Sequence, residues 1–237
     1  MLLKTGAYYG WKDRNFFQEP INRVQRAFYA GLTGKDDIVF DVGANMGQRA
    51  KVFQALARKV IAFEPQPECQ THLISRFGTS GNVILDKVAL ASKRGTETMY
   101  ISSSHTLSSL SRNFIEETGK KIFKNENWNK EIIVETDTMD QKIQQYGMPA
   151  FIKIDVEGFE AEVMSGWTKA GPSLSFEFIP GDMDKINACL GLIDRVSPNY
   201  RFNYTLGEEL RFQLEEHMDF NTFKQQDFLR KASSFGD

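Results

Sequence analysis

The segment from Asp41 to Gly47 (Asp-Val-Gly-Ala-Asn-Met-Gly) constrains the fold of this chain more than any other stretch. A strand-like run from Ile38 to Phe40 leads into it, and the next hydrophobic run, 59–63, ends at Glu64. This order of elements is typical of a cofactor site on an open α/β sheet: a strand, a glycine-containing turn, a helix and a second strand that ends on an acid. We therefore expect a nucleoside-containing cofactor at this turn, with Glu64 bound to its ribose hydroxyls.

The spacing of the glycines separates two kinds of cofactor. A dinucleotide fold uses Gly-x-Gly-x-x-Gly, but counting from Gly43 the second and third glycine positions hold Asn45 and Gln48. Asp41 would repel a phosphate, whereas it suits the cationic amino-acid end of S-adenosylmethionine. The turn therefore favours S-adenosylmethionine, and a nicotinamide-dependent oxidoreductase is the alternative that these departures argue against.

Composition excludes several other classes of protein. The net charge of −2 over 237 residues gives no electrostatic reason to expect a nucleic-acid partner. The cysteines, Cys69 and Cys189, are too few for a disulfide framework and have no metal-ligand spacing. No apolar run approaches the ~20 residues that span a bilayer. We predict a cytoplasmic enzyme without a transmembrane segment.

Strand-like and helix-like segments alternate through the first half of the chain, which predicts a parallel sheet. The expected strands are 37–41, 59–63 and 82–86, with helices at 47–57 and 67–77. An insertion at about 95–136 carries strand-like runs at 97–102 and 131–136 around a polar stretch. The alternation resumes with strands at 150–155 and 174–178, helices at 158–166 and 182–195, and a hairpin of 200–206 with 210–214.

Three regions follow from this pattern. Residues 1–35 form an N-terminal segment with a helix at about 20–30, and it is a candidate lid or acceptor-binding element. Residues 36–222 form the cofactor-binding domain. Residues 223–237 form a polar tail.

Several of these motifs resemble FkbM-type methyltransferases over roughly residues 33–180. The block Lys-Ile-Asp-Val-Glu-Gly-Phe-Glu at 153–160 is the most specific of them. The others are Asp41 to Gly47, Phe63-Glu64-Pro65, Val88-Ala89-Leu90, Ser108-Ser109-Leu110, Gly166 and Phe176-Glu177.

The resemblance implies a doubly wound class I methyltransferase fold, Rossmann-like, with seven strands of which the last is antiparallel. It also implies S-adenosylmethionine as methyl donor and a hydroxyl of a sugar, glycolipid or natural product as acceptor. The implied cofactor-binding residues are Asp41, Gly43, Ala44, Asn45, Gly47, Glu64 and Pro65, with Val88 and Ala89 near the adenine.

The strongest catalytic candidates lie where the strand at 150–155 ends. Asp155 reaches the carboxyl edge of the sheet, and Lys153 alternates to the same side of the strand. The lysine would hold Asp155 ionised as a base or acceptor-orienting group. Glu157 is a further candidate, or else an acid favoured by a helix N-terminus. Glu160 is expected on a solvated helix face.

Other chemistries remain open. Asp155 and Glu177 would hold Mg²⁺ if the reaction depends on a metal. His105, in the insertion, is a candidate general base. An N-methyltransferase is a further alternative, but Asp155-Val156-Glu157-Gly158 replaces the Asn/Asp-Pro-Pro-Phe/Tyr motif typical of amine acceptors, which favours oxygen.

Overall fold

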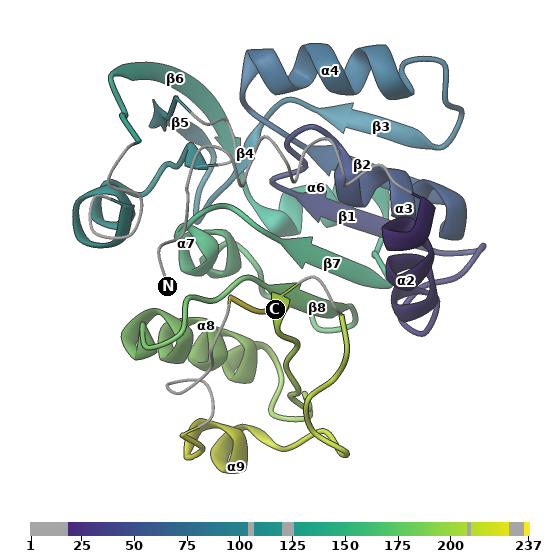
Figure 1. Cartoon of the computed structure of the whole chain (residues 1–237), viewed down its shortest axis with the longest axis vertical. Coiled ribbons are helices and arrows are strands. Elements are labelled where there is room, and N and C mark those ends of the chain that lie inside the picture. Colours follow the sequence, from purple (N-terminus) through teal and green to yellow (C-terminus); the bar gives the residue numbers. More distant parts are fainter. Residues whose placement is uncertain (1–18, 104–106, 120–125, 208–209, 228–234) are drawn as a thin grey trace.

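The computed structural model describes residues 19–103, 107–119, 126–207, 210–227 and 235–237 (Figure 1). A five-stranded parallel sheet lies at its centre, in the order β3-β2-β1-β7-β8. Its strands are β1 Ile38–Val42, β2 Lys59–Phe63, β3 Val83–Asp86, β7 Phe151–Ile154 and β8 Ser173–Phe176. The predicted α/β architecture with a mostly parallel sheet is confirmed.

A second sheet of three strands is formed by the insertion, in the order β4-β6-β5. β5 and β6 are antiparallel, and β4 pairs in parallel with the end of β6. The bounds are β4 Ala89–Leu90, β5 Gly95–Ile101 and β6 Lys130–Asp137. A π-helical turn, η2 (Phe114–Gly119), lies between β5 and β6.

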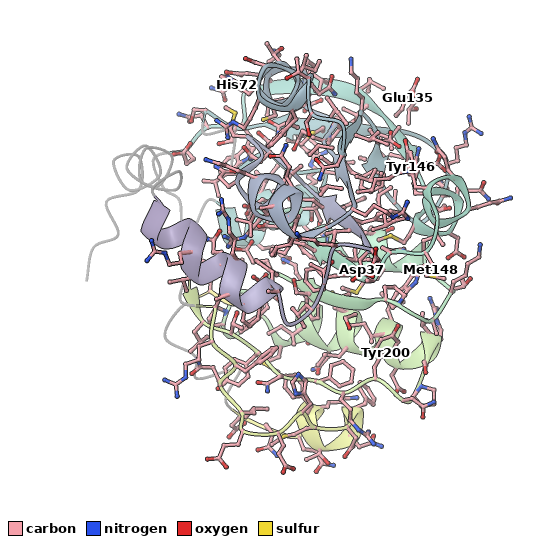
Figure 2. All side chains as sticks on the ribbon, turned by 90° about the vertical axis from the view of Figure 1, so that its right-hand side faces the viewer. Asp37, His72, Glu135, Tyr146, Met148 and Tyr200 are labelled. Atoms are coloured by element: carbon pink, nitrogen blue, oxygen red, sulfur yellow. The ribbon has the colours of Figure 1, made fainter. Side chains whose placement is uncertain are left out.

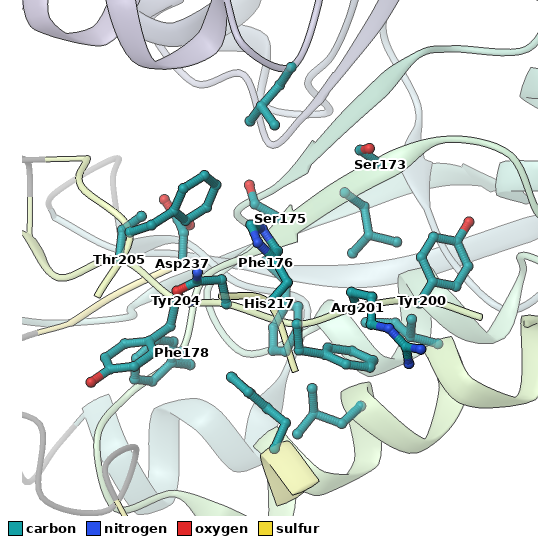
Figure 3. Close-up of a pocket in the computed structure, with 18 of the residues that line it drawn as sticks. Ser173, Ser175, Phe176, Phe178, Tyr200, Arg201, Tyr204, Thr205, His217 and Asp237 are labelled. Carbon is teal, nitrogen blue, oxygen red and sulfur yellow. Dashed lines mark hydrogen bonds between the residues drawn. The ribbon is translucent and has the colours of Figure 1, made fainter. Parts of the chain in front are cut away.

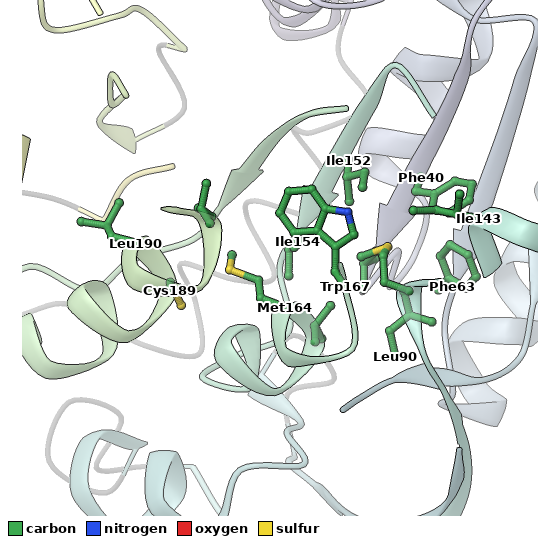
Figure 4. Close-up of a cluster of buried hydrophobic side chains, with 14 of the residues drawn as sticks. Phe40, Phe63, Leu90, Ile143, Ile152, Ile154, Met164, Trp167, Cys189 and Leu190 are labelled. Atoms are coloured by element: carbon green, nitrogen blue, oxygen red, sulfur yellow. The ribbon is translucent and has the colours of Figure 1, made fainter. Parts of the chain in front are cut away.

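Helices cover both faces of the central sheet, because consecutive strand residues point to opposite sides. Val39 and Val60 pack on one face with α2 (Glu19–Tyr29), α3 (Gln48–Leu56) and α4 (Pro67–Phe77). Phe40 and Ile61 pack on the other with α6 (Met139–Tyr146), α7 (Glu160–Ser165) and α8 (Met183–Val196), around the buried Trp167 (Figure 4). α9 (Phe220–Lys224) contacts α8. No helix in the described ranges is long and apolar enough to cross a membrane.

The prediction of one seven-stranded sheet with an antiparallel last strand is wrong for the described residues. The central sheet has five strands and ends at β8, and the antiparallel pair belongs to the second sheet. The seven-stranded count came from the family resemblance, whereas here part of the strand content pairs separately.

The predicted hairpin of 200–206 with 210–214 is also wrong, since the described part of this segment contains no strand. Its aromatic side chains pack instead: the Phe202 ring stacks 5.5 Å from Phe223, and Tyr204 lies edge-on to Phe178 at 6.4 Å. The backbone makes no continuous ladder in the described part of this segment. It forms isolated bridges, such as Phe202 with Met218, and one hydrogen bond from the N–H of Gln213 to the carbonyl of Tyr204 at 2.9 Å. Burial of rings has replaced ladder hydrogen bonds along this stretch.

Candidate active site at the carboxyl edge of the sheet

The turn after β1 passes very close to the end of β7. Gly43 has φ +82°, and a Cβ placed on it would lie 1.9 Å from the carbonyl oxygen of Asp155. Its N–H and that of Ala44 both donate to the carbonyl of Phe63, at 3.0 and 3.1 Å. Only glycine combines this backbone conformation with this approach. The turn therefore joins the ends of β2 and β7, with Ala44 buried beneath it.

The acid at the end of β2 is held by the same turn. Glu64 is buried, and its two carboxylate oxygens accept hydrogen bonds from the backbone N–H groups of Asn45 and Gln66, each at 2.8 Å. Asn45 adopts φ +49°, a conformation that asparagine tolerates well. Burial raises the pKa of Glu64 to about 7, although these hydrogen bonds oppose the shift. The side chain of Gln66 makes a third hydrogen bond to this carboxylate. A carboxylate has about four acceptor sites, so one is left for a ribose hydroxyl.

Asp41, the other acid predicted to contact the cofactor, is buried near the end of β1. It is 2% exposed and stands opposite Lys153 in the strand register. Burial raises the pKa of Asp41 to about 7, while the charge of Lys153 opposes the rise. Its Oδ2 atom is buried and has no hydrogen-bond partner among the described residues. This unsatisfied acceptor fits a cationic group.

Lys153 is an ammonium buried among carboxylates. Its Nζ lies 2.6 Å from Oδ1 of Asp237 and 3.4 Å from Oδ2 of Asp155. Burial alone would lower the pKa of Lys153, but its attraction to these two acids outweighs burial and holds the pKa well above its usual value. The contact with Asp155 has the geometry that the sequence predicted. The contact with Asp237 assigns a residue of the predicted polar tail to the site.

Three carboxylates meet beyond the end of β7. Oxygens of Asp155, Glu157 and Glu177 all lie within 4.8 Å of one another. Burial raises the pKa of Glu177 well above its usual value, and the charges of Asp155 and Glu157 raise it further. Glu157 adopts φ +54° and Gly158 φ +87°, so the chain turns sharply here. A group of this kind can hold a proton near neutral pH.

Two supporting residues were not identified from the sequence. Ser109 is fully buried and donates from Oγ to the carbonyl of Glu157 at 2.6 Å. Glu160 is 7% exposed and accepts from the N–H groups of Val156 and Gly158, at 3.2 and 3.1 Å. The expectation of a solvated face for Glu160 is wrong, because these buried donors need an acceptor. The Ser-Ser-Leu resemblance was the available signal for Ser109.

The remaining predicted residues lie around this group. Pro65 follows Glu64, and Gly47 ends the turn at φ +83°. Ala89 is in the short strand β4, and Val88 precedes it against the core. His105 lies outside the described residues. His72 is exposed on α4 (Figure 2), and His217 lines the cavity beside β8.

Comparison with known proteins identifies the family. Residues 41–228 match the methyltransferase FkbM domain. The chain therefore belongs to the FkbM methyltransferase family, as its motifs indicated.

Individual relatives are more distant. The hexuronic acid methyltransferase AglP of Haloferax volcanii is 26% identical over 160 residues, which are 61% of this chain and 56% of AglP. The chain thus spans about half the length of this curated relative.

Several solved structures resemble the chain, among them two methyltransferases. The methyltransferase FkbM of Methylobacillus flagellatus KT (12% identity, TM-score 0.36) shares 68% of this chain and 45% of its own length. The precorrin-6y C5,15-methyltransferase of Geobacter metallireducens GS-15 (10% identity, TM-score 0.43) shares 81% of this chain and 73% of its own length.

Proposed function

We propose that the protein is an S-adenosylmethionine-dependent O-methyltransferase that acts on a hydroxyl of a sugar or sugar-containing acceptor. The observation that carries the proposal is Glu64, whose carboxylate is fixed at the end of β2 by the N–H groups of Asn45 and Gln66. Membership of the FkbM family and the sugar acid methylated by AglP support it.

The cofactor would lie across the ends of β1 and β2. Glu64 would accept hydrogen bonds from its ribose hydroxyls, and the unsatisfied Oδ2 of Asp41 would attract its amino group. Val88 and Ala89 are proposed to contact the adenine. When bound, S-adenosylmethionine supplies an electrophilic methyl group on a sulfonium.

The carboxylates beyond β7 would serve the acceptor. Asp155, with a side chain 37% exposed, would orient the acceptor hydroxyl and take its proton. The acceptor oxygen forms a bond to the methyl carbon as the carbon–sulfur bond breaks, leaving a neutral thioether. Lys153 would hold Asp155 in place through their contact, and Glu177 would share the proton that arrives. Glu157 is proposed to position this group.

The charge of the group bears on the acceptor. Acids packed within 4.8 Å of one another disfavour an anionic sugar, even when Glu177 holds a proton, so a neutral glycoside is favoured over a hexuronate. Oxygen ligands of this kind also suit Mg²⁺, which would relieve the repulsion, and we keep metal dependence as the alternative. Turnover on glucosides and on matched glucuronides tests the preference for a neutral sugar. The same measurement before and after dialysis against EDTA tests metal dependence. Loss of turnover on dialysis, restored by Mg²⁺, would favour the metal.

Binding and turnover test the cofactor assignment separately. In isothermal titration calorimetry, S-adenosylmethionine should bind and NAD should not. Glu64→Ala should weaken S-adenosylmethionine binding at least about tenfold, because the ribose loses a charged acceptor. Asp155→Ala should leave that binding within about twofold and depress methyl transfer about 10²–10⁴-fold. NAD binding in place of S-adenosylmethionine would overturn the proposal.

A further inference from the structure

A cavity of about 190 Å³ runs along the outer edge of β8 (Figure 3). It exists because β8 is the last strand of the central sheet, and the segment after α8 passes beside it without forming a ladder. The walls come from α2, from β8, from α8 and from residues 200–205. The cavity is therefore enclosed by elements from both faces of the sheet.

Most of the cavity wall is apolar. Aliphatic and aromatic side chains line it, among them Leu32, Phe151, Leu174, Ile186, Leu190 and Phe223. Water makes few hydrogen bonds with such a surface, and an apolar cavity of about 150 Å³ is large enough to take up a benzene ring. This cavity is larger, so a ring or a short alkyl segment fits its volume and its chemistry.

One end of the cavity lies nearest the candidate catalytic group, although Asp155, Glu157 and Glu177 do not line it. Ser175 and Asp237 lie toward this end, while Tyr200 and Arg201 lie at the other (Figure 3). Ser175 stands opposite Lys153 in the strand register, and its buried Oγ has no hydrogen-bond partner among the described residues. Asp237 accepts from Lys153, which also contacts Asp155.

We propose that this cavity binds the apolar part of the acceptor, an aromatic ring or short alkyl segment, while the hydroxylated part extends toward Asp155. The cavity has an apolar middle and polar side chains at both ends, with Ser175 and Asp237 on the side of the catalytic group. An amphipathic molecule matches this wall. The unsatisfied Oγ of Ser175 would take a hydrogen bond from it. The proposal rests on the proposed function and narrows its substrate class to glycosides with an apolar aglycone.

Calorimetry with two neutral glycosides tests this on the full chain. 4-Nitrophenyl β-D-glucopyranoside should bind at least about tenfold more tightly than methyl β-D-glucopyranoside, because only the former can fill the cavity. Equal affinities, within about twofold, would overturn the proposal. This comparison needs no variant and does not depend on the folding of any mutant.

A matched pair of variants locates the binding site. Ser175→Phe places a ring in the cavity and should abolish the preference for the nitrophenyl glycoside. Thr96→Phe adds the same ring on the exposed part of β5 and should leave the preference unchanged. A preference that survives Ser175→Phe would place binding elsewhere and overturn the proposal.

Titration of S-adenosylmethionine into the same samples distinguishes failure of the cavity proposal from failure of the proposed function. If S-adenosylmethionine binds and the nitrophenyl preference is absent, the cavity proposal fails and the proposed function stands. If the preference is present and S-adenosylmethionine does not bind, the proposed function fails while the cavity remains a glycoside site.

Discussion

At the scale of single residues, Gly43 controls how the turn meets the end of β7. We expect Gly43→Ala to abolish measurable S-adenosylmethionine binding and to lower the melting temperature, because the added Cβ meets the Asp155 carbonyl at 1.9 Å and φ is +82°. Thermal melts and calorimetry measure both effects. Gly81→Ala is the control, since a Cβ there meets nothing within 4 Å. Wild-type binding by Gly43→Ala would contradict the role of this contact.

The pair of Lys153 and Asp237 is a second residue-scale feature. Asp237→Asn or Lys153→Met should each lower the free energy of unfolding by about 3–5 kcal/mol, because each breaks a buried ion pair. The first variant leaves Lys153 with only its longer contact to Asp155, and the second leaves Asp237 without its cation. The double variant should lose less than the sum of the two single losses, as urea denaturation can show. Additive losses would mean that the two side chains do not act together.

At the scale of elements, the insertion supports the turn after β7 through Ser109. Ser109→Ala should lower the free energy of unfolding by about 1–2 kcal/mol, because the buried carbonyl of Glu157 loses its donor. Turnover should fall more than S-adenosylmethionine binding, since the change displaces the carboxylate group. Ser103→Ala, which removes an exposed hydroxyl, is the control. An equal loss of stability in both variants would contradict this account.

Most elements of the central sheet could be predicted from the sequence, because short hydrophobic runs bounded by turn residues mark them. Strand β2 and helix α4 begin and end at the predicted residues. The segment 200–214 has the same alternation of rings and polar residues, yet its rings pack on Phe178 and Phe223 instead. Alternation of apolar and polar residues alone does not predict whether a segment pairs with another strand.

Some residues of the candidate site could likewise be placed from the sequence, and others could not. Glu64 and Asp155 could be identified because local sequence places them at strand ends. Asp237 could not, because it meets Lys153 only through the fold, 84 positions away in the sequence. Glu160 was assigned to solvent because a single acid in a helix carries no local sign of the N–H groups it will bind.

At the scale of the whole molecule, buried acids should make stability depend on pH. Burial raises the pKa of Asp41, Glu64 and Glu160 to about 7, from ordinary values near 4. At pH values between about 4 and about 7, the folded protein keeps protons on these acids that the unfolded chain has released. The free energy of unfolding of the ligand-free protein should therefore fall as the pH rises from about 5 to about 7.5. Urea denaturation across this range measures the slope.

One variant pair tests the origin of this slope. Glu160→Gln should make the slope shallower. The total fall in the free energy of unfolding across this pH range should shrink by about 1.4 kcal/mol for each unit of pKa shift removed. Glu162→Gln, on the exposed side of the same helix, should leave the slope unchanged. A stability that stays constant or rises over this interval would show that these acids are ionised without penalty.

The contact between Lys153 and Asp237 also bears on how the protein unfolds. The contact draws residue 237, which belongs to none of the strands of the central sheet, onto the end of β7. Local opening of this segment would hydrate the ammonium and disrupt the site while the strands stay paired. Mild denaturant should accordingly abolish methyl transfer at concentrations that leave the sheet intact.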